Sequence, residues 1–248
     1  MGREVIIPSH DGGRFACYLA APPMANAPGL VLVQYICGVN RVMRRLADEF
    51  AAQGFVVAVP DLFWRQEPGI ALNDDPSHPD PEHHKKALAL NAGFDDTSGI
   101  ADLISTLAWL RQRPECSEKA GVLGYCLGGR LAYLMATRSD ADCSVGYYGV
   151  NINEYLREAD QIRNPLMLHI AGRDELCPPQ AQREIIETLK PNPAVITHVY
   201  EGAGHAFALR GGQNFDVAAA ERADVRSLEF LQQKLASAKL HATVPQGS

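Results

Sequence analysis

Val122-Leu123-Gly124-Tyr125-Cys126-Leu127-Gly128-Gly129 joins a short apolar run to an expected helix through a turn framed by glycines. The segment fits Gly-x-Cys-x-Gly, the thiol form of the nucleophile elbow, in which a sharp strand-to-helix turn lifts a nucleophile clear of a sheet. Gly124 and Gly128 suit such a turn because it needs strained dihedrals and close backbone contact. The first N–H groups of the helix would favour a thiolate at Cys126. The alternative interpretation is a tight turn that holds an ordinary buried cysteine.

Strand-like and helix-like segments alternate on both sides of this turn. Apolar runs bounded by turn residues predict strands over residues 4–8, 14–20, 29–34, 55–59, 143–148, 165–170 and 196–200. Helical spacing predicts helices around residues 43–50, ended by a left-handed Gly54, around 100–110, capped by Thr97 or Ser98, and over about 179–189 and 216–236. This alternation predicts one α/β domain over residues 1–248, with a mostly parallel central sheet and helices on both faces.

Residues 61–98 are the stretch in which the regular pattern breaks down. Several prolines predict a long loop, followed by a short helix from about residue 82 to 90. Long loops in compact domains are often functional, so we expect this region to form one wall of a pocket. We interpret its histidines His78, His83 and His84 as solvated side chains, because no carboxylate or cysteine at metal-ligand spacing accompanies them. The polar segment 241–248 is expected to be a flexible tail.

Composition narrows the class of partner. The 248 residues carry a net charge of -6 and no basic stripe, which argues against nucleic acid or an anionic membrane. No apolar run reaches the length of a membrane span, and the N-terminus has no secretory signal pattern. The six cysteines are expected to be thiols, which fits a cytoplasmic protein. We expect a small-molecule partner, a monomer or small homo-oligomer, and no metal or organic cofactor.

A cysteine nucleophile needs a base, and the base needs an acid that orients it. Asp174 follows the apolar run that ends at Ile170, and His205 follows the run that ends at Tyr200. Loops that follow the carboxyl ends of parallel strands open on one edge of the sheet, so both residues can meet Cys126. The order nucleophile, acid, histidine is the order expected for a nucleophile elbow.

Four competing residues fit these roles less well. His169 and His198 lie inside strand-like runs, where a histidine is more often a core residue. Glu175 would point elsewhere from the loop that carries Asp174, and Asp160 precedes its strand and so lies at the wrong edge.

Taken together, these motifs give the chain a resemblance to the dienelactone hydrolase family, small cysteine hydrolases of the α/β-hydrolase fold, through nearly its whole length. The segments that carry the resemblance are Gly38-Val39-Asn40, Pro60-Asp61-Leu62-Phe63, Gly124 to Gly129, Val145-Gly146-Tyr147-Tyr148-Gly149-Val150, Gly172-x-Asp174 and Gly204-His205-x-Phe207. The resemblance implies hydrolysis of a lactone or carboxylic ester through an acyl-enzyme. It assigns Cys126 as nucleophile, His205 as base and Asp174 as the orienting acid. It also implies an oxyanion hole made of the backbone N–H groups of Ile36 and Leu127.

The chain departs from the family pattern in its expected pocket. Tyr35 stands where the family has a glutamate, and a phenol with a usual pKa of about 10 cannot act as an anion near neutral pH. We therefore expect Cys126 to rest more nearly as a thiolate paired with His205, or the phenol of Tyr35 to donate to the oxyanion. Leu209 stands where the family has an arginine that grips a carboxylate, and an apolar side chain cannot do this. We therefore expect a pocket that is less selective for anions. The expected substrate-binding residues are Tyr35, Cys37, His84, Leu88, Ala206, Phe207, Leu209 and Arg210.

Two other functions fit the same residues. A thioesterase, amidase or acyltransferase would use the same triad and change the bond or the acceptor. A non-catalytic small-molecule-binding protein would retain only the fold, which separates from function in many families. Turnover by the native chain and its loss in Cys126→Ala distinguish the catalytic alternatives from the binding protein.

Overall fold

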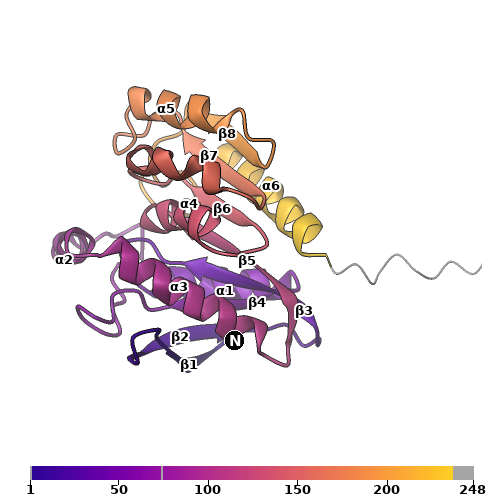
Figure 1. Ribbon diagram of the computed structural model, residues 1–248. Coiled ribbons are helices and arrows are strands. Elements are labelled where there is room, and N and C mark those ends of the chain that lie inside the picture. The colour runs from indigo at the N-terminus through magenta and orange to yellow at the C-terminus, as the bar shows by residue number, and fades with distance from the viewer. Residues whose placement is uncertain (1, 74, 237–248) are drawn as a thin grey trace, which may run out of the picture.

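The structure is a computed structural model that describes residues 2–73 and 75–236, so the expected tail at 241–248 lies outside the described residues. Within these ranges one sheet contains all the strands (Figure 1), namely β1 Arg3–Pro8, β2 Arg14–Ala20, β3 Ala27–Val33, β4 Val56–Pro60, β5 Cys116–Tyr125, β6 Ser144–Tyr147, β7 Leu166–Ala171 and β8 Val195–Tyr200. Their order across the sheet is β1-β2-β4-β3-β5-β6-β7-β8. β2 runs antiparallel to β1 and β4, and the other neighbours are parallel. The predicted mostly parallel sheet is confirmed.

Helices cover both faces of the sheet, as predicted (Figure 1). The buried apolar residues of α3 (Asp96–Arg111), α4 (Leu127–Arg138) and α5 (Pro179–Leu189) belong to one apolar core. Most buried apolar residues of α1 (Arg41–Ala52) and α6 (Val217–Leu235) belong to the core on the other face. Strands buried between two layers must be apolar on both faces, which explains the continuous apolar runs of β3 and β4. Gly54, just beyond α1, has the predicted left-handed backbone, with φ 96°.

Three local features differ from the sequence-based expectations. The helix in the long loop, α2 (Pro81–Ala92), is longer than expected because Asp80 caps it and Pro81 occupies its first turn. The prediction that Thr97 or Ser98 caps α3 is wrong. Asp95 is the cap, and its carboxylate accepts hydrogen bonds from the backbone N–H groups of Thr97 and Ser98. A 3-10 helix, η1 (Ile152–Gln161), was not predicted.

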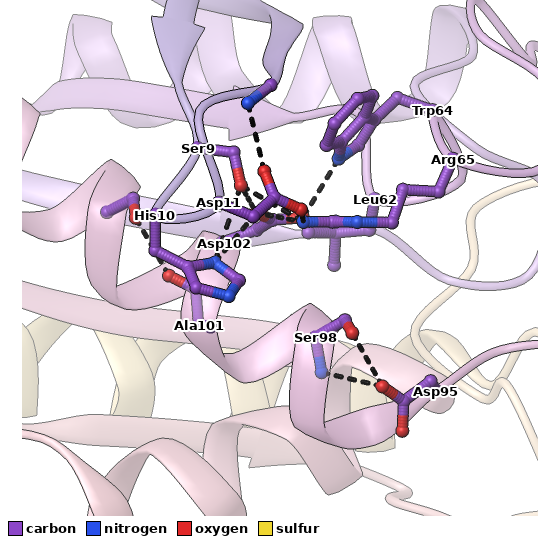
Figure 2. A network of polar contacts seen from close by, with 12 residues as sticks. Ser9, His10, Asp11, Leu62, Trp64, Arg65, Asp95, Ser98, Ala101 and Asp102 are labelled. Carbon is purple, nitrogen blue, oxygen red and sulfur yellow. Dashed lines mark hydrogen bonds and ion pairs between the residues drawn. The ribbon is translucent and has the colours of Figure 1, made fainter.

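A buried carboxylate joins the N-terminal hairpin to α3 and to the chain that follows β4 (Figure 2). Asp102 is fully buried in α3 and accepts hydrogen bonds from Ser9 Oγ at 2.7 Å and from Trp64 Nε1 at 2.9 Å. The guanidinium of Arg65 also binds Asp102, and it reaches Asp11 at 2.7 Å. This network fixes the start of the 61–98 region against the sheet, and with it the base of the expected pocket wall.

Candidate active site

Cys126 occupies a strained turn between β5 and α4. Its backbone has φ 56° and ψ -114°, a conformation that non-glycine residues rarely adopt. A Cβ atom on Gly124 would lie 2.1 Å from the carbonyl oxygen of Gly128, and one on Gly128 would lie 2.5 Å from that of Val33. Both glycines are therefore required by close backbone contacts, as predicted. Leu127 begins α4, where backbone N–H groups lack intrahelical acceptors.

Asp174 and His205 meet at the same edge of the sheet. His205 Nδ1 lies 2.9 Å and 3.1 Å from the two carboxylate oxygens of Asp174. The loops that carry them are tied together, because the N–H of Arg173 donates to the carbonyl of Ala203 at 2.8 Å. Asp174 also accepts a hydrogen bond from the N–H of Leu176 at 2.8 Å, which fixes its carboxylate. Both side chains are buried, which strengthens their interaction.

Both neighbours of His205 act on its pKa. Burial lowers the pKa. Hydrogen bonds with Asp174 and Cys126, together with the charges of these two groups, raise it by more than burial lowers it, and the resulting pKa is about 10. The aromatic ring of Tyr148 packs edge-on against the imidazole, with 5.2 Å between ring centroids. The residues expected to form a triad are therefore brought together at the carboxyl edge of the sheet. Cys126 follows β5, Asp174 follows β7 and His205 follows β8.

The segment that carries Ile36 leaves β3 beside this elbow. Its turn contains Gly38, which has φ 76° and forms an isolated antiparallel bridge with Ala71. Two backbone hydrogen bonds flank the bridge, from Val39 N–H to the carbonyl of Ile70 at 3.0 Å and from Leu72 N–H to the carbonyl of Cys37 at 2.9 Å. The long loop thus pairs with the segment that would carry one oxyanion donor.

The predicted substrate residues nearest the triad differ in exposure. Tyr35 is half-buried, and its phenol oxygen accepts a hydrogen bond from Asn40 Nδ2 at 2.7 Å. Cys37 is buried, and burial raises its pKa to about 11. Ala206 is half-buried with φ 62°. Phe207 is fully buried and packs against Tyr148 and Tyr200, so it supports the site from below.

The remaining predicted substrate residues lie farther out. His84 and Leu88 are exposed residues of α2, whereas Ala87 and Leu90 are buried, and contact of His84 or Leu88 with a substrate stays a prediction. Leu209 is half-buried. Arg210 is exposed, and its guanidinium lies 3.8 Å from carboxylate oxygens of both Glu49 and Asp224.

Sequence reasoning missed the local roles of Asn40, Tyr148 and Asn214. Asn214 donates from Nδ2 to the carbonyl of His205 at 3.0 Å and so supports the histidine loop. Tyr148 has φ 36°, which no sequence pattern indicates. Asn40 had a usable signal, because asparagine directly before a helix is a favoured N-cap.

Three general features of the described residues bear on the kind of site. No group of three or more His, Cys, Asp and Glu side chains within the described ranges is placed to hold a metal ion. Across the same ranges, every helix is too short or too polar to cross a membrane. The six cysteines all lie in the described part of the chain and are unpaired.

Comparison with known proteins places this geometry among related chains. The model of the dienelactone hydrolase family matches residues 15–235. A protein of Azospirillum brasilense is 42% identical over an alignment of 243 positions, which covers 94% of this chain and 99% of the relative. The carboxymethylenebutenolidase of Pseudomonas putida is 37% identical over 227 residues, covering 92% of this chain and 94% of that enzyme.

Solved structures share the fold at lower identity. A protein of Klebsiella pneumoniae has a TM-score of 0.82 at 24% identity, covering 94% of this chain and 98% of its own. The dienelactone hydrolase-like promiscuous phosphotriesterase P91, from metagenomic libraries, has a TM-score of 0.78 at 16% identity and covers 95% of this chain and 99% of its own. At these identities the two structures support the α/β-hydrolase fold alone.

Proposed function

The chain belongs to the dienelactone hydrolase family and is a carboxylic ester or lactone hydrolase, and we propose that Cys126 is its nucleophile. The observation that carries this proposal is the connected series of Asp174, His205 and Cys126 at a strained elbow. A nucleophile in contact with a base, which is itself oriented by an acid, is the arrangement that covalent catalysis requires. The partner is a small molecule, in keeping with the family.

The reaction proceeds in two steps. The sulfur of Cys126 attacks the carbonyl carbon, and the N–H groups of Ile36 and Leu127 stabilise the oxyanion that develops. The tetrahedral adduct collapses, the carbon–oxygen bond breaks, and protonated His205 gives its proton to the leaving alkoxide. Water then loses a proton to His205 and attacks the thioester. The acid departs, Cys126 leaves as a thiolate and His205 is again protonated.

The raised pKa of His205 determines the pH at which kcat/KM is expected to fall on the alkaline side. In the folded chain it is about 10, above the usual 6.5, so folding favours the protonated imidazole. This contribution to stability is complete below the unfolded pKa and is lost as the pH rises through the folded one. We expect kcat/KM for a neutral ester to persist through neutral pH and to fall as the pH approaches 10, since neutral His205 cannot protonate the leaving group. Initial rates, corrected with Cys126→Ala for hydroxide-driven hydrolysis, test this, and an alkaline fall that begins near neutral pH would contradict it.

We propose that the pocket prefers substrates less acidic than dienelactone. Leu209 supplies no positive charge, and an uncompensated carboxylate is costly to bury. Arg210, the next residue, lies beside Glu49 and Asp224, which partly neutralise it. Neither position supplies a free positive charge for a carboxylate, and both support a lactone or simple ester without one.

A substrate panel tests both the reaction and this preference. Neutral lactones and aryl esters should give a higher kcat/KM than acidic lactones of matched size. Leu209→Arg should raise kcat/KM for the acidic members by about tenfold and leave the neutral members little changed, because a charge-assisted hydrogen bond contributes about 1.4 kcal/mol or more. A preference of the native chain for acidic lactones would refute the altered pocket. Absence of turnover across the panel would instead favour a binding protein.

We further propose a cytoplasmic location and a monomer or small homo-oligomer. Unpaired thiols, including one that must stay reduced to act as nucleophile, fit a reducing compartment. Fractionation of cells and light scattering of the purified chain test the two statements separately.

A further inference from the structure

We propose that Asn40 is a positioning residue for acyl transfer, which fixes the backbone segment carrying the Ile36 N–H so that it can stabilise an oxyanion. This inference deepens the proposed function and rests on it. Asn40 would not touch the substrate. It would act through the turn formed by residues 35–40, which connects β3 to α1.

The carboxamide of Asn40 is fully buried and uses both of its ends. Its oxygen accepts a hydrogen bond from the N–H of Met43 at 3.1 Å, which caps α1. Its nitrogen donates to the phenol oxygen of Tyr35 at 2.7 Å and to the carbonyl of Leu72 at 2.7 Å. One side chain therefore ties together the first residue of the turn, the start of a helix and the long loop.

The geometry of this turn depends on those ties. The N–H of Gly38 donates to the carbonyl of Tyr35 at 3.2 Å, so the backbone reverses around Ile36. On its far side the turn lies against the long loop, and a Cβ atom on Gly38 would come within 2.1 Å of the carbonyl oxygen of Ile70. The amide nitrogen of Asn40 donates to both the Tyr35 phenol and the Leu72 carbonyl, so it links the first residue of the turn to the long loop. The direction of the Ile36 N–H follows from the turn, because residue 36 lies between its two fixed ends.

A second asparagine extends this connection to the expected pocket wall. Asn73 Nδ2 donates to the sulfur of Cys37 at 3.8 Å, and Asn73 Oδ1 accepts from the N–H of Asp80 at 3.0 Å. Asp80 is the N-cap of α2. The oxyanion segment and α2 thus share one hydrogen-bonded framework, in which Asn40 holds the buried end.

The competing explanation is that Asn40 only caps α1. Asn40→Ser separates the two roles, because the hydroxyl can still accept from Met43 N–H while the donors to Tyr35 and Leu72 are lost. The control is Asp95→Ser, which also replaces an N-cap by serine, that of α3, and leaves the turn at 35–40 intact. Thermal unfolding of both variants shows how much of any change comes from capping alone.

Three measurements on the full-length chain test the proposal. They are kcat/KM for a neutral aryl ester, the inhibition constant of an aldehyde that forms a tetrahedral adduct with Cys126, and the rate of alkylation of Cys126 by iodoacetamide. Alkylation develops no oxyanion, so it does not depend on the Ile36 N–H. In Asn40→Ser we expect kcat/KM and aldehyde affinity to fall together by roughly 10- to 100-fold, because a donor displaced from the oxyanion loses most of its effect. Alkylation should keep the native rate, and Asp95→Ser should leave all three unchanged.

Two results would overturn the proposal. Unchanged kcat/KM and aldehyde affinity in Asn40→Ser would mean that the turn does not need this side chain. An equal fall in alkylation and hydrolysis would mean that the variant disturbs the site as a whole. If the native chain hydrolyses no ester, the proposed function fails. The role of Asn40 is then still decided by comparing aldehyde affinity with the alkylation rate of Cys126 in the native chain and in Asn40→Ser.

Discussion

Replacing Cys126 with alanine is expected to lower kcat/KM for esters and lactones by at least about 1,000-fold, because the sulfur that forms the acyl-enzyme is removed. The elbow itself should survive, since alanine adds no atom to a turn whose crowding comes from Gly124 and Gly128. Initial rates on the best substrate of the panel provide the comparison. Mass spectrometry of rapidly quenched native enzyme should reveal an acyl adduct on the peptide that contains Cys126, and the variant should lack it.

Cys116→Ala is the matched control for this prediction. Cys116 begins β5 and Cys126 follows its end, so the two thiols lie at opposite edges of the sheet. Both are buried and unpaired. Cys116→Ala should retain native kcat/KM and the acyl adduct, at some cost in stability for the lost sulfur. If Cys126→Ala retained more than about a tenth of native activity, the covalent mechanism would be wrong and His205 would have to activate water directly.

The fold and the meeting of Cys126, Asp174 and His205 at one edge of the sheet could be predicted from sequence, because the signals for both are local. Apolar runs ended by glycine or proline fix where strands stop, and in a parallel sheet the loops after them share one edge. Asp174 and His205 follow such strand ends, so their convergence on Cys126 needed no knowledge of packing. The need for glycine at positions 124 and 128 could also be predicted, because the turn allows no side chain at either position.

Features that depend on contacts between distant segments could not be predicted in this way. The capping role of Asp95 was missed because Thr97 and Ser98, nearby, are equally good caps by residue type. Asn40 lies in a recognisable motif, yet its bond to Leu72 depends on how the long loop returns to β3. The pocket wall was the least predictable part, since periodicity cannot say which side of α2 faces a substrate.

The Asp102 network is another set of contacts between distant segments, and Asp102→Ala is expected to lower the free energy of unfolding by about 3 to 5 kcal/mol. The carboxylate is fully buried, and its loss leaves Ser9, Trp64 and Arg65 without their shared acceptor. Arg65 keeps its contact with Asp11, but that pair is partly exposed and contributes little. Asp95→Ala on the same helix is the control, because losing an exposed N-cap typically costs about 1 kcal/mol. Urea unfolding of both variants decides the matter, and equal losses would mean that water or rearrangement replaces the buried carboxylate at little cost.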